Sequence, residues 1–126
     1  MRYWHKIKTT TISLHYRSFV VQLPENCCNH KTENPQICIQ TFLKNEEQVS
    51  IIITDNGSGI TEKVRKCIFD PFFTTKPVGK GTGMGLSISY QIIVERHQGK
   101  LQCISEPEQG ASFVIDIPLR QLGNNN

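Results

Sequence analysis

The sequence predicts an α/β domain, in which a β-sheet is packed against helices. Strand-like runs lie on either side of one helical run, in the order 36–42, 49–54, 85–97 (helical), 100–105 and 111–117. A chain of 126 residues supports a single hydrophobic core. These segments are therefore expected to form one sheet with its helices packed against it.

The first two strands are predicted from alternation and from residue type. Ile37, Ile39 and Thr41 alternate with polar residues in the first run, whereas V-S-I-I-I-T-D (49–55) is largely apolar and β-branched. A continuous apolar run predicts a central strand that is buried on both faces and ends at Asp55. The segment N-E-E-Q between the two runs predicts a hairpin turn.

The region after the second strand is marked by a capping residue and by two prolines. Thr61 is expected to cap a short helix over 62–68. Pro71 and Pro77 interrupt regular structure, which leaves 74–83 as a flexible segment.

The remaining boundaries are predicted in the same way. Gly99 follows the helical run 85–97 and is expected to form its C-terminal cap. Upstream, the Thr-rich stretch 9–23 alternates like a strand and ends at Pro24. The Asn-rich end of the chain, 120–126, is expected to be a disordered tail.

Composition and charge narrow the class of protein. No apolar run approaches the ~18 residues that span a bilayer, and the basic start lacks the apolar stretch of a secretory signal. A cytoplasmic location is therefore expected. The formal charge of +3 comes from residues 1–33, which hold five Lys/Arg against two Asp/Glu. The rest of the chain, residues 34–126, has no formal net charge, which argues against a nucleic-acid-binding face on it.

The cysteines and histidines do not predict a metal centre. The five cysteines form no C-x-x-C pair, and the four histidines are scattered. Free thiols in a reducing compartment are the simpler interpretation than disulfides. Cys38 and Cys103 fall in strand-like runs, where they are expected to pack as small core residues.

A glycine-rich turn, D-N-G-S-G-I (55–60), follows the predicted central strand. A carboxylate such as Asp55 in this position can accept a hydrogen bond from an exocyclic amine, for example the adenine 6-amino group. Gly57 and Gly59 allow positive φ and a close approach of the backbone. The structural alternative is an ordinary Asx turn in D-N-G.

A second glycine-rich turn, G-K-G-T-G-M-G-L (79–86), opens the helical run. Three of its glycines predict backbone N–H groups that point toward phosphates at the start of a helix. These glycines are Gly81, Gly83 and Gly85. Lys76 and Lys80 flank the turn, and they either neutralise phosphate charge or remain solvated. Because Lys80 is followed by glycine rather than Ser or Thr, the turn is not a P-loop. A flexible loop without a ligand is the alternative.

Three blocks in sequence resemble the C-terminal two-thirds of a sensor histidine kinase ATP-binding domain, over 34–119. They are the first glycine box (55–60), the phenylalanine box I-F-D-P-F-F-T-T-K (68–76) and the second glycine box (79–86). The resemblance implies an α/β two-layer sandwich, with a mixed sheet and helices on one face. It implies that this fold is incomplete at its N-terminus, because residues 1–33 do not match.

The resemblance also implies an ATP site. Its implied ATP-binding residues are Asp55, Asn56, Gly57, Gly59, Ile60, Lys76, Lys80, Gly81, Thr82, Gly83, Met84, Gly85, Leu86 and Ser112. Ser112 corresponds to a small polar residue on the strand beneath the adenine. The phenylalanines of the second block are expected to anchor a lid or fill the core rather than to contact the ligand; they are Phe69, Phe72 and Phe73.

The family transfers the γ-phosphoryl group of ATP to a histidine on a separate dimerisation domain, for relay to a response regulator. Its Mg²⁺ is held by an Asn on a helix with an E-x-x-x-x-N-L-x-x-N-A-like pattern, which residues 1–33 do not show. No histidine of the chain lies in an H-E-x-R/K-x-P-like setting. No catalytic residue or metal ligand is therefore assigned, and the isolated chain is expected not to autophosphorylate.

Two interpretations from other classes remain open at this stage. One is a non-catalytic module that binds a nucleotide or a protein. The other is a non-functional fragment of a truncated, frameshifted or recombined kinase gene. A module would show the fixed aromatic signals of a packed core, whereas a fragment would be molten and bind hydrophobic dyes.

Overall fold

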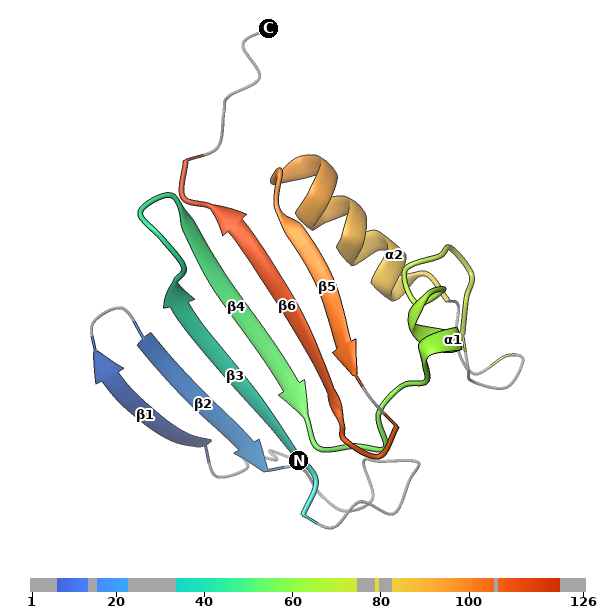
Figure 1. The fold of residues 1–126 in the computed structure, drawn as a ribbon, viewed down its shortest axis with the longest axis horizontal. Helices are drawn as coiled ribbons and strands as arrows, with labels where there is room; N and C mark the ends of the chain where they lie inside the picture. The colour runs from blue at the N-terminus through green and yellow to red at the C-terminus, as the bar shows by residue number, and fades with distance from the viewer. Residues whose placement is uncertain are drawn as a thin grey trace, which may run out of the picture.

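The computed structural model describes most of the chain, namely residues 7–13, 16–22, 34–74, 79, 83–105 and 107–120. Its centre is a six-stranded sheet with the strand order β1-β2-β3-β4-β6-β5 (Figure 1). The strands are β1 (Ile7–Ser13), β2 (Tyr16–Gln22), β3 (Gln36–Leu43), β4 (Gln48–Asp55), β5 (Lys100–Ser105) and β6 (Ala111–Pro118). The predicted fold class, a sheet with packed helices, is confirmed.

All five pairings between the described strands are antiparallel, whereas a mixed sheet was predicted. The reason is the position of β6. Strands β4 and β5 run in the same direction, but β6 lies between them and is antiparallel to both. The chain therefore crosses from β4 to β5 through its helices without making a parallel pair.

The hairpin predicted between the first two strand-like runs is confirmed as the β3–β4 pair. Its turn is closed by the N–H of Lys44, which donates to the carbonyl of Gln48 at 2.9 Å. The side chain of Asn45 accepts a hydrogen bond from the N–H of Glu47 at 2.9 Å. This Asx-type turn sets the register of the pair, in which Ile39 lies opposite Ile53.

The stretch 9–23 was predicted as one strand, and this prediction is wrong. The structure divides it between β1 and β2, which pair antiparallel with Ser13 opposite Tyr16. Strands in globular domains are commonly about 5–6 residues long, so a fifteen-residue β-like stretch favours a hairpin over one strand.

Two helical segments connect β4 to β5 along the chain. Helix α1 (Glu62–Arg65) begins after Thr61, whose hydroxyl accepts a hydrogen bond from the N–H of Val64 at 3.3 Å, as a predicted N-cap should. Helix α2 (Gly85–Tyr90) continues directly into the π-helical segment η2 (Gln91–Arg96). The predicted long helix is confirmed, and its second half has π-helical rather than α-helical geometry.

Gly99 closes this helix, but steric contact rather than backbone conformation explains the glycine. Its N–H donates to the carbonyl of Ile93 at 2.8 Å. The positive φ of 54° belongs to Gln98 instead. A Cβ atom on Gly99 would lie only 2.5 Å from the backbone oxygen of Asp116, so the close approach of β6 excludes any side chain.

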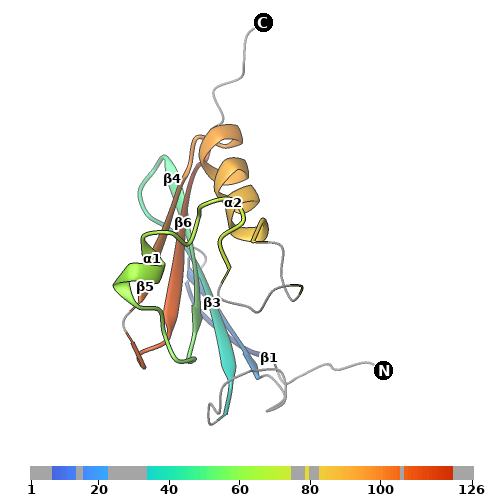
Figure 2. The ribbon, with the colours of Figure 1, turned by 90° about the vertical axis from the view of Figure 1, so that its right-hand side faces the viewer.

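The prediction that the second strand is buried on both faces is wrong for β4. Ser50 is its one buried residue, and the others are half-buried. Figure 1 shows both described helices on the β5 side of the sheet, and Figure 2 shows α2 along one face. Helices gathered at one edge leave the middle of the sheet less covered, which explains the partial burial of β4.

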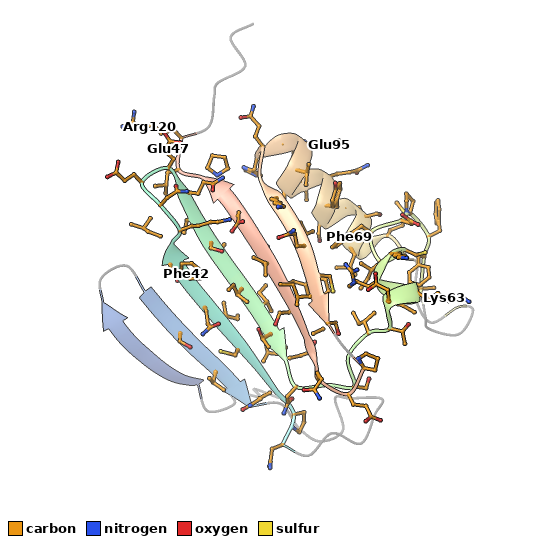
Figure 3. All side chains as sticks on the ribbon, viewed as in Figure 1. Phe42, Glu47, Lys63, Phe69, Glu95 and Arg120 are labelled. Atoms are coloured by element: carbon orange, nitrogen blue, oxygen red, sulfur yellow. The ribbon has the colours of Figure 1, made fainter. Side chains whose placement is uncertain are left out.

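The buried apolar residues lie after α1, on β5 and at the start of β6. The buried apolar residues of the described part are Ile68, Leu101, Cys103 and Ala111. The ring of Phe69, which Figure 3 labels, is tilted against that of Tyr90 on α2 with 5.4 Å between the ring centroids. It meets the ring of Phe113 on β6 edge-on, with 6.5 Å between the centroids. These aromatic contacts join the segment after α1 to α2 and to the end of the sheet that carries the glycine box. None of the described helices is long and apolar enough to cross a membrane.

Candidate nucleotide-binding site

Asp55 lies at the end of β4, opposite Ala111 of β6. One carboxylate oxygen, Oδ1, accepts hydrogen bonds from the N–H of Gly57 at 2.8 Å and from the N–H of Ala111 at 3.3 Å. Among the described residues, none donates to the second oxygen, Oδ2. The Asx turn considered as an alternative is therefore present, but it occupies only one of the two carboxylate oxygens.

The backbone around this carboxylate leaves little room for side chains. A Cβ on Gly57 would lie 3.0 Å from the Asp55 Oδ1 atom, so a larger residue would crowd the carboxylate. Gly59 has a φ of 74°, a conformation that residues with a side chain rarely adopt. Gly59 therefore takes the positive φ predicted for it, whereas Gly57 does not, and at Gly57 the nearby carboxylate limits the room for a side chain.

The turn between β5 and β6 packs against the same loop. A Cβ on Gly110 would lie 2.2 Å from the carbonyl oxygen of Asp55. The N–H of Glu108 donates to the carbonyl of Ser58, and the N–H of Ile60 donates to the Ser105 hydroxyl at 2.7 Å. The glycine box is therefore held from two sides, by its own Asx turn and by this hairpin.

Asn56 is engaged with the start of β3. Its Oδ1 accepts a hydrogen bond from the N–H of Gln36 at 2.9 Å, and its Nδ2 donates to the carbonyl of Asn34 at 3.0 Å. In this structure the side chain of Asn56 joins two backbone segments. It thereby positions the loop in which Asp55 and Gly57 lie.

Ser112 lies one residue pair away from Asp55 along the sheet. Its hydroxyl is 2.8 Å from the hydroxyl of Thr54, the residue opposite it on β4. Cross-strand hydroxyl pairs of this kind stabilise an antiparallel sheet. The structure thus brings Ser112 close to the glycine box through Thr54.

The second glycine box is described at its end and at residue 79. Gly83 has a φ of 69°, and a Cβ there would lie 2.2 Å from the backbone of Phe72. Phe72 itself has a φ of 64° and is 75% exposed, so its backbone rather than its ring packs against the box. Four predicted site residues lie outside the described residues: Lys76, Lys80, Gly81 and Thr82.

The rest of this box leads into α2. Met84 precedes the first residue of the helix, and its carbonyl accepts a hydrogen bond from the Ser87 hydroxyl at 2.9 Å. A Cβ on Gly85 would meet no atom within 4 Å, so packing does not require glycine there. Leu86 is 36% exposed on the first turn of α2.

A buried thiol lies near the carboxylate. Burial raises the pKa of Cys103, and the charge of Asp55 raises it further, whereas Arg65 opposes the shift. The thiol therefore stays neutral near physiological pH. Cys103 is 6% exposed and behaves as the small core residue that was predicted, whereas Cys38 is half-buried.

Three residues of this arrangement were absent from the predicted set: Ser105, Gly110 and Ala111. Ala111 contributes only a backbone N–H, which leaves no signature in residue type. The signal for Ser105 and Gly110 lies in strand register, because Ser105 pairs with Ala111, the residue that follows Gly110. The described residues contain no group of three His, Cys, Asp or Glu side chains that could hold a metal ion.

An antiparallel sheet with helices and a carboxylate held beside a glycine-rich loop defines an ATPase class. The family model of histidine kinase-, DNA gyrase B- and HSP90-like ATPases matches residues 11–121. The chain belongs to this family.

Within the family, the similar proteins are sensor kinases. The signal transduction histidine-protein kinase AtoS of Escherichia coli (strain K12) is 46% identical over 89 residues, which cover 71% of this chain. These residues span only 14% of AtoS. The catalytic domain of histidine kinase ThkA is 35% identical with a TM-score of 0.59, covering 75% of this chain and 60% of that one.

A third match is the structure of histidine kinase ThkA in complex with the response regulator protein TrrA. It has a TM-score of 0.57 and 31% identity, and covers 77% of this chain and 26% of that one. Together these similarities identify the chain as the ATPase domain of a histidine kinase.

Proposed function

We propose that this chain is the ATP-binding part of a two-component sensor histidine kinase, and that it reads adenine through Asp55. The geometry of that carboxylate carries the proposal. Two backbone N–H groups fix Oδ1, and no described residue donates to Oδ2. An amine donor in the plane of a bound purine would complete the coordination of the carboxylate.

The chemistry of the site favours adenine over guanine. The 6-position of adenine carries an amine, which donates a hydrogen bond, whereas guanine has a carbonyl oxygen there. A carboxylate only accepts hydrogen bonds, so a carbonyl facing Asp55 would leave two acceptors in contact. A site that pairs its polar groups with one ligand rejects the analogue that leaves them unpaired.

The phosphates would lie at the second glycine box. Gly83 precedes a continuous helical segment of α2 and η2 that begins at Gly85, and the first N–H groups of this segment carry partial positive charge. Lys76 and Lys80 would add positive charge beside the phosphates, as their places in the sequence suggest. Mg²⁺ accompanies ATP in this family, and the described residues contain no group of three His, Cys, Asp or Glu side chains that could hold it.

The γ-phosphoryl group would pass to a histidine on a separate domain and then to a response regulator. Phosphoryl transfer depends mainly on positioning and on charge neutralisation. This chain contributes the nucleotide site to that reaction. The ThkA–TrrA complex supports a regulator as the eventual partner. Incubation with Mg-ATP should yield no acid-labile phosphohistidine on the chain alone, and such a product would contradict this division of roles.

Titration calorimetry tests the proposal. The full chain should bind ATP and ADP, with GTP bound at least about tenfold more weakly. Asp55→Asn replaces one acceptor oxygen by a donor and should weaken ATP binding by about 10–100-fold, since hydrogen bonds to charged groups contribute about 1.5–3 kcal/mol.

Asp70→Asn is the matched control, because Asp70 is exposed and lies outside the site. It should leave the affinity unchanged. Equal affinity of the wild-type chain and Asp55→Asn for ATP would refute the role of Asp55. Failure of the folded wild-type chain to bind either nucleotide would refute the function itself and would favour a protein-binding module.

A further inference from the structure

We propose that Ser105 is a positioning residue, which holds the glycine box in the shape that lets Asp55 select adenine. The inference rests on the nucleotide site proposed above. Ser105 is the last residue of β5 and is half-buried. Its hydroxyl makes two hydrogen bonds at once, one with the glycine box and one with the β5–β6 turn.

The first bond reaches the end of the glycine box. The N–H of Ile60 donates to the Ser105 Oγ atom at 2.7 Å. Ile60 is the last residue of D-N-G-S-G-I, so this bond fixes the point at which the loop leaves the site. Asp55, at the other end of the loop, is fixed by its place in β4.

The second bond reaches the β5–β6 turn. The Ser105 hydroxyl donates to the carbonyl of Gly110 at 2.7 Å. That carbonyl belongs to the peptide unit whose N–H is that of Ala111, and this N–H holds the Asp55 Oδ1 atom at 3.3 Å. Ser105 therefore orients the same peptide plane that positions the carboxylate.

Ser105 suits both bonds because a hydroxyl is a donor and an acceptor in one group. An alanine would leave the N–H of Ile60 and the carbonyl of Gly110 without this partner. The loop and the turn would keep one direct backbone bond, from Glu108 to Ser58, and the steric contact of Gly110 with Asp55. The fold can survive on these contacts, but the Asp55 carboxylate would be less well oriented.

The expected result is a loss of discrimination as well as of affinity. In the Ser105→Ala chain, ATP binding should weaken about tenfold, because a peptide plane that is free to tilt no longer holds the Asp55 Oδ1 atom. GTP binding does not depend on how the Asp55 carboxylate is oriented. The ratio of ATP affinity to GTP affinity should therefore fall by a similar factor. A merely structural defect would weaken both nucleotides together and leave the ratio unchanged.

A pair of variants of equal shape isolates the hydroxyl. S105T keeps the hydroxyl and should retain the wild-type affinity ratio, whereas S105V has a similar volume without it and should behave like S105A. S18A is the matched control, because Ser18 is a strand residue whose hydroxyl contacts Cys38 at 3.6 Å on β3, away from the glycine box. It should leave the ratio unchanged.

Amide hydrogen exchange of the nucleotide-free chain provides an independent readout. The Ile60 amide should exchange about tenfold faster in S105A and S105V than in the wild-type chain and S105T. If wild-type ATP binding is absent, the proposed function fails, and this exchange rate still decides whether Ser105 positions the loop. Unchanged exchange at Ile60 in S105V, or an unchanged ATP to GTP ratio in a chain that binds ATP, would overturn the inference.

Discussion

At the residue scale, two carboxylates on the β4–β6 pair have opposite surroundings. Asp55, at one end, is held by backbone N–H groups on a single oxygen. Asp116, at the other end, has both oxygens occupied, since Lys44 donates to Oδ2 at 2.6 Å and Ser50 donates to Oδ1 at 2.7 Å. The carboxylate of Asp116 is thus fully paired within the fold, whereas that of Asp55 keeps one oxygen that can still accept a hydrogen bond.

The Lys44–Asp116 pair predicts a pH-dependent contribution to stability. Burial would raise the pKa of Asp116, but hydrogen bonds from Lys44 and Ser50 outweigh it and hold the pKa below its usual value. A lowered folded-state pKa stabilises the native chain above the unfolded pKa, near ~4, and this stability is lost as pH falls through the folded-state pKa. The Lys44 side chain is 47% exposed, so solvent reduces the strength of the pair.

Lys44→Met should therefore lower the free energy of unfolding by about 1–2 kcal/mol at pH 7. The difference from the wild-type chain should vanish at low pH, where Asp116 is protonated in both. Urea unfolding at a series of pH values measures this. Lys63→Met is the control, because Lys63 is exposed on α1 (Figure 3) and should change little. A deficit that persists at low pH would show that Lys44 stabilises the fold through packing alone.

At the scale of elements, local patterns predicted where segments begin and end, but not always why. The N-cap at Thr61 was predicted from residue type alone and is confirmed, because its bond to Val64 lies within one helical turn. Gly99 was predicted as a helix end for its backbone freedom. Its neighbour Gln98 takes the positive φ, and Gly99 is needed because β6 approaches it. That approach joins residues far apart in the chain and has no local signature.

A pair of glycine substitutions separates these two causes. Gly99→Ala should lower the free energy of unfolding by about 1–3 kcal/mol, because its Cβ would overlap the Asp116 backbone oxygen. Gly85→Ala should change it by less than about 1 kcal/mol, since a Cβ there meets no atom within 4 Å. Urea unfolding monitored by circular dichroism measures both. Equal stability of the two variants would refute the steric account of Gly99.

At the scale of the whole molecule, the sequence predicted the elements better than the way in which they cover one another. The strand runs and the long helix were found because their periodicity is local. The partial burial of β4 and the antiparallel pairing throughout the described strands were missed, because both depend on where distant segments pack. The site divides in the same way. Asp55 and its glycines were predicted from one loop, whereas Ser105 joins that candidate site only through the register of β5 with β6.

The measurement that tests the central claim most directly is a nuclear magnetic resonance titration of the ¹⁵N-labelled chain with ATP. The claim is that the adenine binds at the Asp55 carboxylate, so the amide signals of Gly57 and Ala111, which bond to that carboxylate, should shift most strongly. GTP at the same concentration should shift them less. Saturable shifts confined to the β1–β2–β3 side of the sheet, with Gly57 and Ala111 unmoved, would contradict the account.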